Sequence, residues 1–276
     1  MQTEKERLDV LIVEKNLAES RNKAKELITS GKVKVDGIPV KKPGSLVSKN
    51  SNITLVSNEK NWVSRGAYKL LKALDVFEVN PKGYYCIDIG ASTGGFAEVL
   101  LERGAALVYA VDVGYGQLAW RLRQDTRVKV MERTNARYLT SEMFEHAIDL
   151  ISIDVSFISL KLILPVAAKL LKDGGCCICL VKPQFEAGRE YVGKNGVIKD
   201  PNIHLMVLSE LSDFINEKTD FELCNVNFSP ILGPKGNREY LFLLRKKEAC
   251  TPKSINVTIE QLEKIVRDSH ENGAIK

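Results

Sequence analysis

The stretch Asp88-Ile-Gly-Ala-Ser-Thr-Gly-Gly-Phe96 follows a short apolar run and leads into a helical pattern. It therefore predicts a strand, a glycine-rich turn and a helix. Glycines in such a turn let a ligand approach the backbone, and the N-terminus of the helix offers unpaired N–H groups. A dinucleotide-binding loop spaces its glycines as Gly-x-Gly-x-x-Gly, whereas this loop reads Gly-x-x-x-Gly-Gly. The spacing disfavours NAD as the ligand.

Around this loop, from about residue 84 onward, short apolar runs alternate with helical patterns, which is typical of a doubly wound, mostly parallel, Rossmann-like α/β sheet. The predicted strands cover residues 84–89, 107–111, 128–131, 148–153, 176–181, 222–227 and 239–245. Ligands bind beyond the carboxyl ends of such strands. Polar residues stand at five of these ends, which a purely structural sheet would not need: Asp88, Asp112, Asn135, Asp154 and Lys182.

The spacing of one acidic residue suggests which cofactor binds. Asp112 follows Gly90 by about twenty residues, the interval at which an acid meets ribose hydroxyls in nucleotide-binding folds. S-adenosylmethionine fits, because it has a ribose and an amino acid moiety but no pyrophosphate. We expect Asp88 and the loop to bind the amino acid moiety and Asn135 to contact the adenine. The predicted cofactor-binding residues are Asp88, Gly90, Ala91, Ser92, Thr93, Gly94, Gly95, Phe96, Asp112 and Asn135.

Most of the net charge of +5 lies in the first 60 residues, where twelve Lys/Arg oppose eight Asp/Glu. Helical spacing predicts helices over residues 7–16 and 21–29, and Ser20 is a good N-cap for the second. Alternation predicts a hairpin over residues 32–41 that turns at Asp36-Gly37, and a strand over residues 53–56. On composition alone, a solvated charged face and a phosphate-contacting surface are equally compatible with this region.

The order of these N-terminal elements resembles the small RNA-binding domain named after a ribosomal small-subunit protein, which also occurs in tyrosyl-tRNA synthetases and pseudouridine synthases. The resemblance rests on Arg-Leu-Asp at residues 7–9, Ser-Arg-Asn-Lys-Ala-Lys-Glu-Leu-Ile at 20–28 and Gly-Lys-Val-Lys-Val-Asp-Gly at 31–37. It implies that five basic side chains face RNA phosphates: Arg21, Lys23, Lys25, Lys32 and Lys34.

Four further polar residues each have an ordinary explanation when considered alone. Lys69 fits the outer face of an amphipathic helix, Asp154 suits a helix N-cap, and Glu239 suits half of a surface ion pair. Lys182 ends a predicted strand, because the proline after it favours an extended backbone.

Together with their flanking segments, these residues resemble the TlyA family, often labelled haemolysin-like, whose catalytic domain is similar to the FtsJ-type ribose 2′-O-methyltransferases. The matching runs are residues 62–67, 88–96, 112–120, 132–137, 154–160, 181–185 and 233–240. The resemblance implies a catalytic tetrad at Lys69, Asp154, Lys182 and Glu239. It also implies cytidines of ribosomal RNA as substrate, on both subunits for members of this length.

The chemistry of methyl transfer gives these four residues roles. A protonated ribose 2′-hydroxyl is a poor nucleophile, so the reaction needs a general base and in-line geometry more than a metal. A lysine serves as a base only where burial or a neighbouring cation lowers its pKa. We assign Lys182 as the base and Asp154 as the residue that orients it. Lys69 and Glu239 are expected to position the hydroxyl.

With 276 residues, 44% of them hydrophobic, the chain has enough apolar material for two domains. The expected parts are an RNA-binding domain (1–59), a linker (60–63), a methyltransferase domain (64–248) and a C-terminal segment (249–276) with helical spacing over residues 255–271. We expect S-adenosylmethionine as cofactor, ribosomal RNA and ribosomal subunits as partners, and a monomer. The six cysteines are expected to be free thiols without a metal site, and none of the three histidines, which stand in unrelated contexts, to be catalytic.

Two other classes of function remain open from the sequence. The haemolysin-like label suggests a membrane-active toxin, but no apolar run approaches the roughly 20 residues of a membrane span and the N-terminus is polar. These features favour a cytoplasmic protein that does not bind membranes. A ribosome-binding factor without catalysis is the second alternative, against which the complete set of candidate residues argues.

Overall fold

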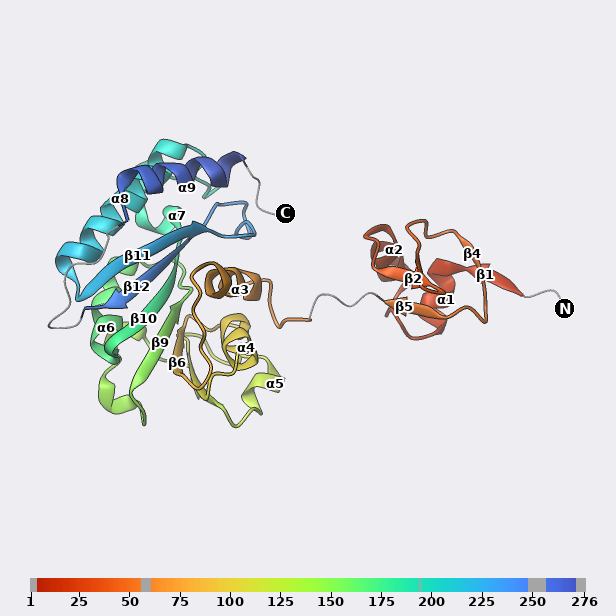
Figure 1. Cartoon of the computed structure of the whole chain (residues 1–276), viewed down its shortest axis with the longest axis horizontal. Helices are drawn as coiled ribbons and strands as arrows, with labels where there is room; N and C mark the ends of the chain where they lie inside the picture. The colour runs from red at the N-terminus through yellow and green to blue at the C-terminus, as the bar shows by residue number, and fades with distance from the viewer. Residues whose placement is uncertain (1–3, 56–60, 194, 248–256, 272–276) are drawn as a thin grey trace. The chain divides into compact units, whose positions relative to one another are not determined.

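The computed structural model describes residues 4–55, 61–193, 195–247 and 257–271 (Figure 1). Its internal contacts divide the chain into two compact units, Met1–Asn61 and Trp62–Lys276. Among the described residues, no helix combines the length and apolar character that crossing a membrane requires. The expected linker begins at Lys60, which lies outside the described residues.

The N-terminal unit packs two helices against two small sheets. Its strands are β1 (Lys5–Arg7), β2 (Val33–Val35), β3 (Ile38–Pro39), β4 (Leu46–Ser48) and β5 (Ile53–Leu55). β1 pairs with β4, and β2 lies between β3 and β5, all antiparallel. The hairpin turns where the sequence predicts, because Asp36 and Gly37 adopt the positive φ values of 49° and 82° that a tight hairpin turn requires.

The two helices of this unit supply its core. α1 (Leu8–Glu14) and α2 (Arg21–Thr29) turn their apolar side chains towards β2 and β5. The Ser20 hydroxyl accepts a hydrogen bond from the Lys23 N–H and so caps α2 at the predicted residue. The β1–β4 pair was not predicted, because strands of three residues are too short to show a clear alternation.

The C-terminal unit is built on a seven-stranded sheet in the order β11-β12-β10-β9-β6-β7-β8. Its strands are β6 (Tyr85–Ile89), β7 (Leu107–Val111), β8 (Val128–Met131), β9 (Ile148–Ile153), β10 (Leu171–Val181), β11 (Phe221–Phe228) and β12 (Tyr240–Lys246). β12 is antiparallel to β10 and β11, and the pairs that join β10, β9, β6, β7 and β8 are parallel. The predicted mostly parallel α/β fold is therefore confirmed.

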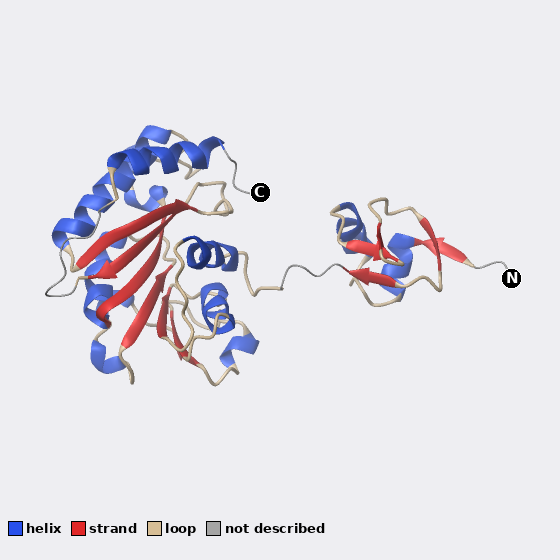
Figure 2. Ribbon diagram, viewed as in Figure 1, coloured by secondary structure: helices blue, strands red, loops and turns tan. Residues whose placement is uncertain are grey.

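Helices cover both faces of this sheet (Figure 2). α3 (Ala67–Val76), α4 (Gly95–Glu102) and α5 (Trp120–Arg123) supply residues to one apolar core. α6 (Leu164–Leu170), α8 (Pro201–Lys218) and α9 (Ile259–Glu271) supply residues to the other. A short helix, α7 (Pro183–Glu186), follows β10, and single 3-10 turns occupy residues 136–138, 141–143, 160–162 and 189–191. Because both faces are covered, the parallel strands are nearly continuous apolar runs.

Some element boundaries differ from those predicted. β10 begins at Leu171, five residues before the predicted start, and its pairing with β9 changes register between Leu171 and Cys176. α9 begins at Ile259, and residues 255 and 256 of the predicted helix lie outside the described residues. The five described cysteines are free thiols, and Cys250 lies outside the described residues. No group of three or more metal-ligating side chains occurs in the described ranges.

Candidate functional site

The glycine-rich loop lies where β6 ends and touches the end of β9. Gly90 has a φ of +84°, and a Cβ atom there would lie 2.4 Å from the backbone oxygen of Asp154. Gly94 has a φ of +97° and immediately precedes α4. Because other residues rarely adopt these backbone angles, both positions require glycine. The glycines therefore bring the loop against the segment that carries Asp154.

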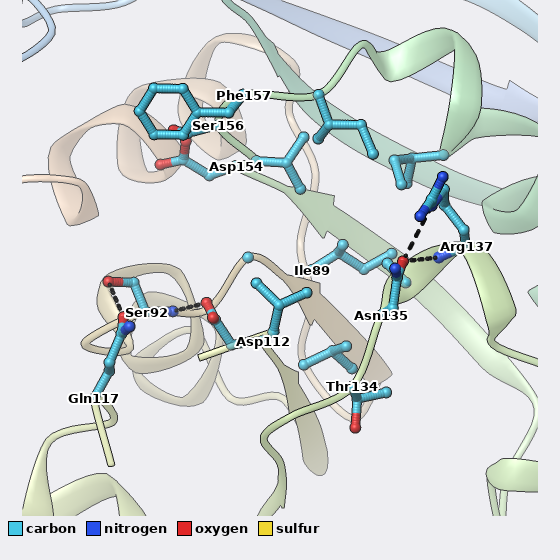
Figure 3. A pocket seen from close by; sticks show the side chains of 17 residues that line it. Ile89, Ser92, Asp112, Gln117, Thr134, Asn135, Arg137, Asp154, Ser156 and Phe157 are labelled. Carbon is cyan, nitrogen blue, oxygen red and sulfur yellow. Dashed lines mark hydrogen bonds between the residues drawn. The ribbon is translucent and has the colours of Figure 1, made fainter. Parts of the chain in front are cut away.

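Asp112, at the end of β7, connects two loops around a cavity of about 480 Å³ (Figure 3). Its carboxylate accepts hydrogen bonds from the Ser92 N–H at 2.8 Å and from the Gly114 N–H at 2.7 Å. Asn135 lies across the cavity, where its side chain accepts a hydrogen bond from the Arg137 N–H at 3.1 Å. A cavity lined by Gly90 and the Asp112 carboxylate fits a nucleoside without phosphate groups. S-adenosylmethionine is such a nucleoside.

The structure gives Asp88 a different position from the one expected. Its side chain is fully buried and lies on the wall of neither this cavity nor the one beside Lys69. It accepts hydrogen bonds from the Ala97 N–H and the Ser152 hydroxyl, both at 2.9 Å. Burial raises the pKa of Asp88 to about 7, and the hydrogen bond from Ser152 opposes this rise. Asp88 thus anchors the start of α4 from below the loop.

Most of the other predicted loop residues line one or both of two cavities. Ala91, Thr93, Gly95 and Phe96 line a second cavity of about 260 Å³, and Gly90 and Ser92 line both this cavity and the one beside Asp112. Gly94 lies on neither wall, and a Cβ atom there would overlap Leu122. Its part is to shape the turn.

The second cavity contains the four candidate catalytic residues, which come from four separate segments: Lys69 in α3, Asp154 after β9, Lys182 after β10, and Glu239 before β12. The Lys182 Nζ lies 2.6 Å from the Asp154 Oδ1, and the Lys69 Nζ lies 2.7 Å from the Glu239 Oε2. The two pairs are joined, because the Lys69 Nζ also lies 3.9 Å from the Asp154 Oδ2.

Burial excludes the ordinary explanations for Lys69 and Glu239. Lys69 is only 7% exposed and Glu239 only 2%, so neither is a surface residue. Burial raises the pKa of Glu239, and the nearby Lys69 ammonium opposes this rise. Two amines and two carboxylates offset one another, which is the condition under which charges are tolerated in a protein interior.

Sequence reasoning missed two serines that complete this site. The Lys182 amine donates a hydrogen bond to the Ser156 hydroxyl at 2.9 Å, and Ser156 lines both cavities. Ser64 lies against the start of α4, where a Cβ atom on Gly95 would be 2.2 Å from its hydroxyl oxygen. Both serines stand within runs that matched the family, but their contacts cross between segments and leave no local signal.

The neighbours of Glu239 attach this residue to α9. The Arg238 guanidinium donates hydrogen bonds to the backbone oxygens of Ser269 and His270, and the Tyr240 hydroxyl lies 3.1 Å from the Ser269 hydroxyl. Since side chains alternate along an extended chain, Arg238 and Tyr240 face α9 while Glu239 faces Lys69.

Two histidines that appear unrelated in the sequence meet behind this segment. The rings of His204 and His270 lie 5.1 Å apart, so the expectation of unrelated contexts was wrong for this pair. The His204 Nδ1 lies 2.6 Å from the Tyr240 hydroxyl. Burial lowers the pKa of His204 to about 4 and also lowers that of His270, so both are neutral near pH 7 and support the fold.

In the N-terminal unit, a buried carboxylate holds two arginines. Asp9 is fully buried and lies 2.9 Å from the Arg7 Nε and 3.0 Å from an Arg21 guanidinium nitrogen. Hydrogen bonding to Arg7 is the main cause that lowers the pKa of Asp9 to about 2. The arginine side chains remain about half exposed, at 47% and 55%. Of these two arginines, only Arg21 is among the predicted RNA-binding residues.

The remaining predicted RNA-binding residues differ in their surroundings. Lys25 is exposed on α2, whereas the Lys23 amine pairs with Glu26 at 3.0 Å. Lys32 and Lys34 are half-buried around β2. Of these four lysines, Lys25 is the exposed one.

The fold and the two sites define a methyltransferase with an added RNA-binding module. The model of the FtsJ-like methyltransferase family matches residues 62–246, and that of the S4 domain family matches residues 6–53. The fold and this family imply S-adenosylmethionine as the methyl donor.

Similarity to individual proteins shows which group of FtsJ-like methyltransferases the chain belongs to. The chain is 51% identical to YqxC of Bacillus subtilis over 88% of this chain and 87% of that protein. It is 48% identical to the 16S/23S rRNA (cytidine-2′-O)-methyltransferase TlyA of Mycobacterium tuberculosis, over 87% of this chain and 89% of that protein. A solved structure of a hemolysin-type protein from Streptococcus thermophilus shares 44% identity with a TM-score of 0.72, covering 98% of this chain and 97% of that chain. The chain belongs to the TlyA family of FtsJ-like methyltransferases.

Proposed function

We propose that this protein transfers a methyl group from S-adenosylmethionine to the ribose 2′-oxygen of cytidines in the RNA of both ribosomal subunits. The observation that carries the proposal is the convergence of Lys69, Asp154, Lys182 and Glu239 in a cavity next to the glycine-rich loop. The Mycobacterium tuberculosis relative supports the substrate, because its name specifies cytidine-2′-O-methylation of 16S and 23S rRNA.

The cavity beside Asp112 is the proposed cofactor site. When bound, S-adenosylmethionine supplies an electrophilic methyl group on a sulfonium. A carboxylate has about four lone-pair positions, so Asp112 can accept ribose hydroxyls in addition to its two backbone N–H groups. Ser92 and Asn135 complete the polar wall, and Gly90 allows close approach to the backbone.

The tetrad prepares the attacking hydroxyl. In its neutral form Lys182 accepts the proton of the 2′-hydroxyl, and Asp154, 2.6 Å away, stabilises the ammonium that forms. Ser156 fixes the direction of the amine through its hydrogen bond. Lys69 and Glu239 form the opposite side of the site and orient the ribose.

The proposed division of labour follows the two units. Residues 1–59 bind RNA through Arg21, Lys23, Lys25, Lys32 and Lys34, with Arg7 added from the contacts of Asp9. Residues 60–63 are the linker, residues 64–248 perform the chemistry, and residues 249–276 form a C-terminal segment whose helix α9 holds the chain around Glu239. We propose that the enzyme acts as a cytoplasmic monomer on ribosomal subunits, without a metal or a membrane.

The experiment incubates unmethylated ribosomal subunits with the protein and S-adenosylmethionine, and identifies the product by nucleoside-resolved mass spectrometry. We expect one methyl group on a cytidine 2′-oxygen in each subunit. Lys182→Ala is expected to abolish transfer while leaving cofactor binding, followed by calorimetric titration, nearly unchanged. Turnover in this variant would remove Lys182 from the role of base, and cofactor binding without methylation of either subunit would exclude the ribosomal substrate. Vesicle leakage caused by the protein would instead support a membrane-active toxin.

A further inference from the structure

A third cavity, of about 360 Å³, borders the tetrad on the side of α7. It shares Lys182 and Glu239 with the tetrad cavity, and it shares Ser156 and Phe157 with the cavity proposed for the cofactor. All three cavities therefore meet at Ser156. The volume of the third cavity falls within the range of about 300–1,000 Å³ that is typical of small-ligand sites.

The geometry of methyl transfer indicates what this third cavity holds. The attacking oxygen, the methyl carbon and the sulfur must lie in line, so the ribose approaches from the side away from the sulfur. If the cofactor lies beside Asp112 and the proton acceptor is Lys182, the ribose lies at the tetrad. The base attached to that ribose then has the third cavity as its nearest space.

The walls of this cavity suit a flat heterocycle. Phe157 is 89% exposed on a backbone with a φ of +64°, an angle that a bulky residue adopts rarely. Its ring centroid lies 4.9 Å from that of Phe185, and both rings line the cavity. Aromatic rings of this kind stack on nucleobases that have left their helix.

Gln184 lines this cavity, and its side-chain oxygen has no hydrogen-bond partner within the described part of the chain. The Gln184 Oε1 is buried and accepts no hydrogen bond. A buried acceptor left unpaired is costly, so a site that contains one favours a ligand that supplies a donor. Cytosine carries an amino donor at its 4-position, where uracil carries an acceptor oxygen.

We propose that the third cavity holds the base of the target nucleotide and that the Gln184 Oε1 accepts a hydrogen bond from the 4-amino group of cytosine. With its oxygen turned to the base, Gln184 distinguishes cytidine from uridine, whereas the reversed amide would present a donor that suits uridine. This inference rests on the proposed function, and it adds the source of base selectivity, which the tetrad cannot supply because the 2′-hydroxyl is the same in both nucleosides.

The experiment compares two ribosomal substrates that differ at one position. Subunits carrying the methylated cytidine, once mapped, are compared with subunits in which that nucleotide is uridine, and kcat/KM is measured for each. Wild-type protein is expected to prefer cytidine by about tenfold or more, since a polar group matched to one substrate rejects its analogue strongly. Gln184→Met, similar in shape but without the acceptor, is expected to bring this ratio to within about twofold of one.

A second variant separates this role from a structural one. Gln184→Glu keeps acceptor oxygens and, when ionised, cannot turn a donor towards uridine, so the preference for cytidine is expected to persist or increase. A cytidine preference that survives Gln184→Met, or no preference in the wild-type protein, would overturn the inference and leave the proposed function intact. Absence of cytidine methylation by wild-type protein would instead contradict the proposed function itself.

Discussion

Each unit of this molecule pairs two basic side chains with carboxylates, but the basic side chains differ in how far they are buried. In the N-terminal unit Asp9 is buried while its partners Arg7 and Arg21 remain about half exposed, at 47% and 55%. In the C-terminal unit the side chains of Lys69 and Lys182 are each only 9% exposed. Charge left at the surface attracts phosphates over a distance, whereas buried charge acts strongly on one atom. The difference in burial thus separates the proposed binding surface from the proposed reaction site.

The largest effect is expected where the buried cluster loses one member. Lys69→Met removes the ammonium that lies 2.7 Å from the buried Glu239 carboxylate, so we expect a loss of about 3–5 kcal/mol in the free energy of unfolding. The double variant Lys69→Met/Glu239→Gln removes the unpaired charge and is expected to regain most of this loss. Denaturation followed by tryptophan fluorescence measures it, because Trp62 and Trp120 both lie in the C-terminal unit.

Lys72 offers a matched control on the same helix. Its amine lies 3.7 Å from the centroid of the Phe228 ring instead of beside a carboxylate. Lys72→Met is therefore expected to cost no more than about 1 kcal/mol. Equal losses in the free energy of unfolding for Lys69→Met and Lys72→Met would show that the Lys69–Glu239 pair contributes no more to stability than the Lys72–Phe228 contact.

A smaller effect is expected at the half-exposed cluster. Asp9→Asn removes the charge that fixes Arg7 and Arg21, and we expect a loss of about 1 kcal/mol in stability, since the arginines are screened by solvent. The pKa of Asp9 is lowered to about 2, so its contribution is complete above the unfolded pKa of about 4 and is lost as the pH falls through 2. Hydrogen exchange at the α1 and α2 amides between pH 5 and pH 2 measures this, and a flat profile would contradict it.

The smallest effect concerns single exposed lysines. Lys25→Ala is expected to reduce the salt dependence of RNA binding by about one counterion, whereas Lys23→Ala is expected to reduce it less, because Glu26 already pairs with Lys23. Filter binding to ribosomal RNA over a series of salt concentrations gives both slopes. Identical slopes for the two variants would mean that the intrahelical pair does not matter once RNA is bound.

The sequence predicted elements well where local periodicity carries the information. β7, β8 and β9 have the predicted boundaries, and the hairpin turns at Asp36-Gly37, because buried strands and tight turns are encoded in neighbouring residues. β10 was predicted too short, since its first part contains Lys172, Asp173 and two glycines, and a register shift separates the pairing of Leu171 with β9 from the regular pairing that begins at Cys176.

The candidate site was predictable to a lesser extent. Motif resemblance selected the four charged residues, and the structure places them within one network. The burial of Asp88, the pairing of His204 with His270 and the second arginine on Asp9 were not predicted. The first two depend on contacts between segments distant in sequence. The third is local, but Arg7 and Asp9 stand two positions apart with Leu8 alone between them, which is too short a segment to form a periodic signal.

The contact of Gly90 with Asp154 couples the glycine-rich loop to the segment that carries the Asp154 carboxylate. A single added methyl group at residue 90 would lie 2.4 Å from the Asp154 backbone oxygen, so one of the two segments would have to move. An engineer who grafts a loop for a different cofactor onto this sheet must therefore keep a glycine there. Otherwise the new loop would shift the carboxylate beside Lys182 as well. Cofactor choice and reaction chemistry are, in this fold, a single design problem.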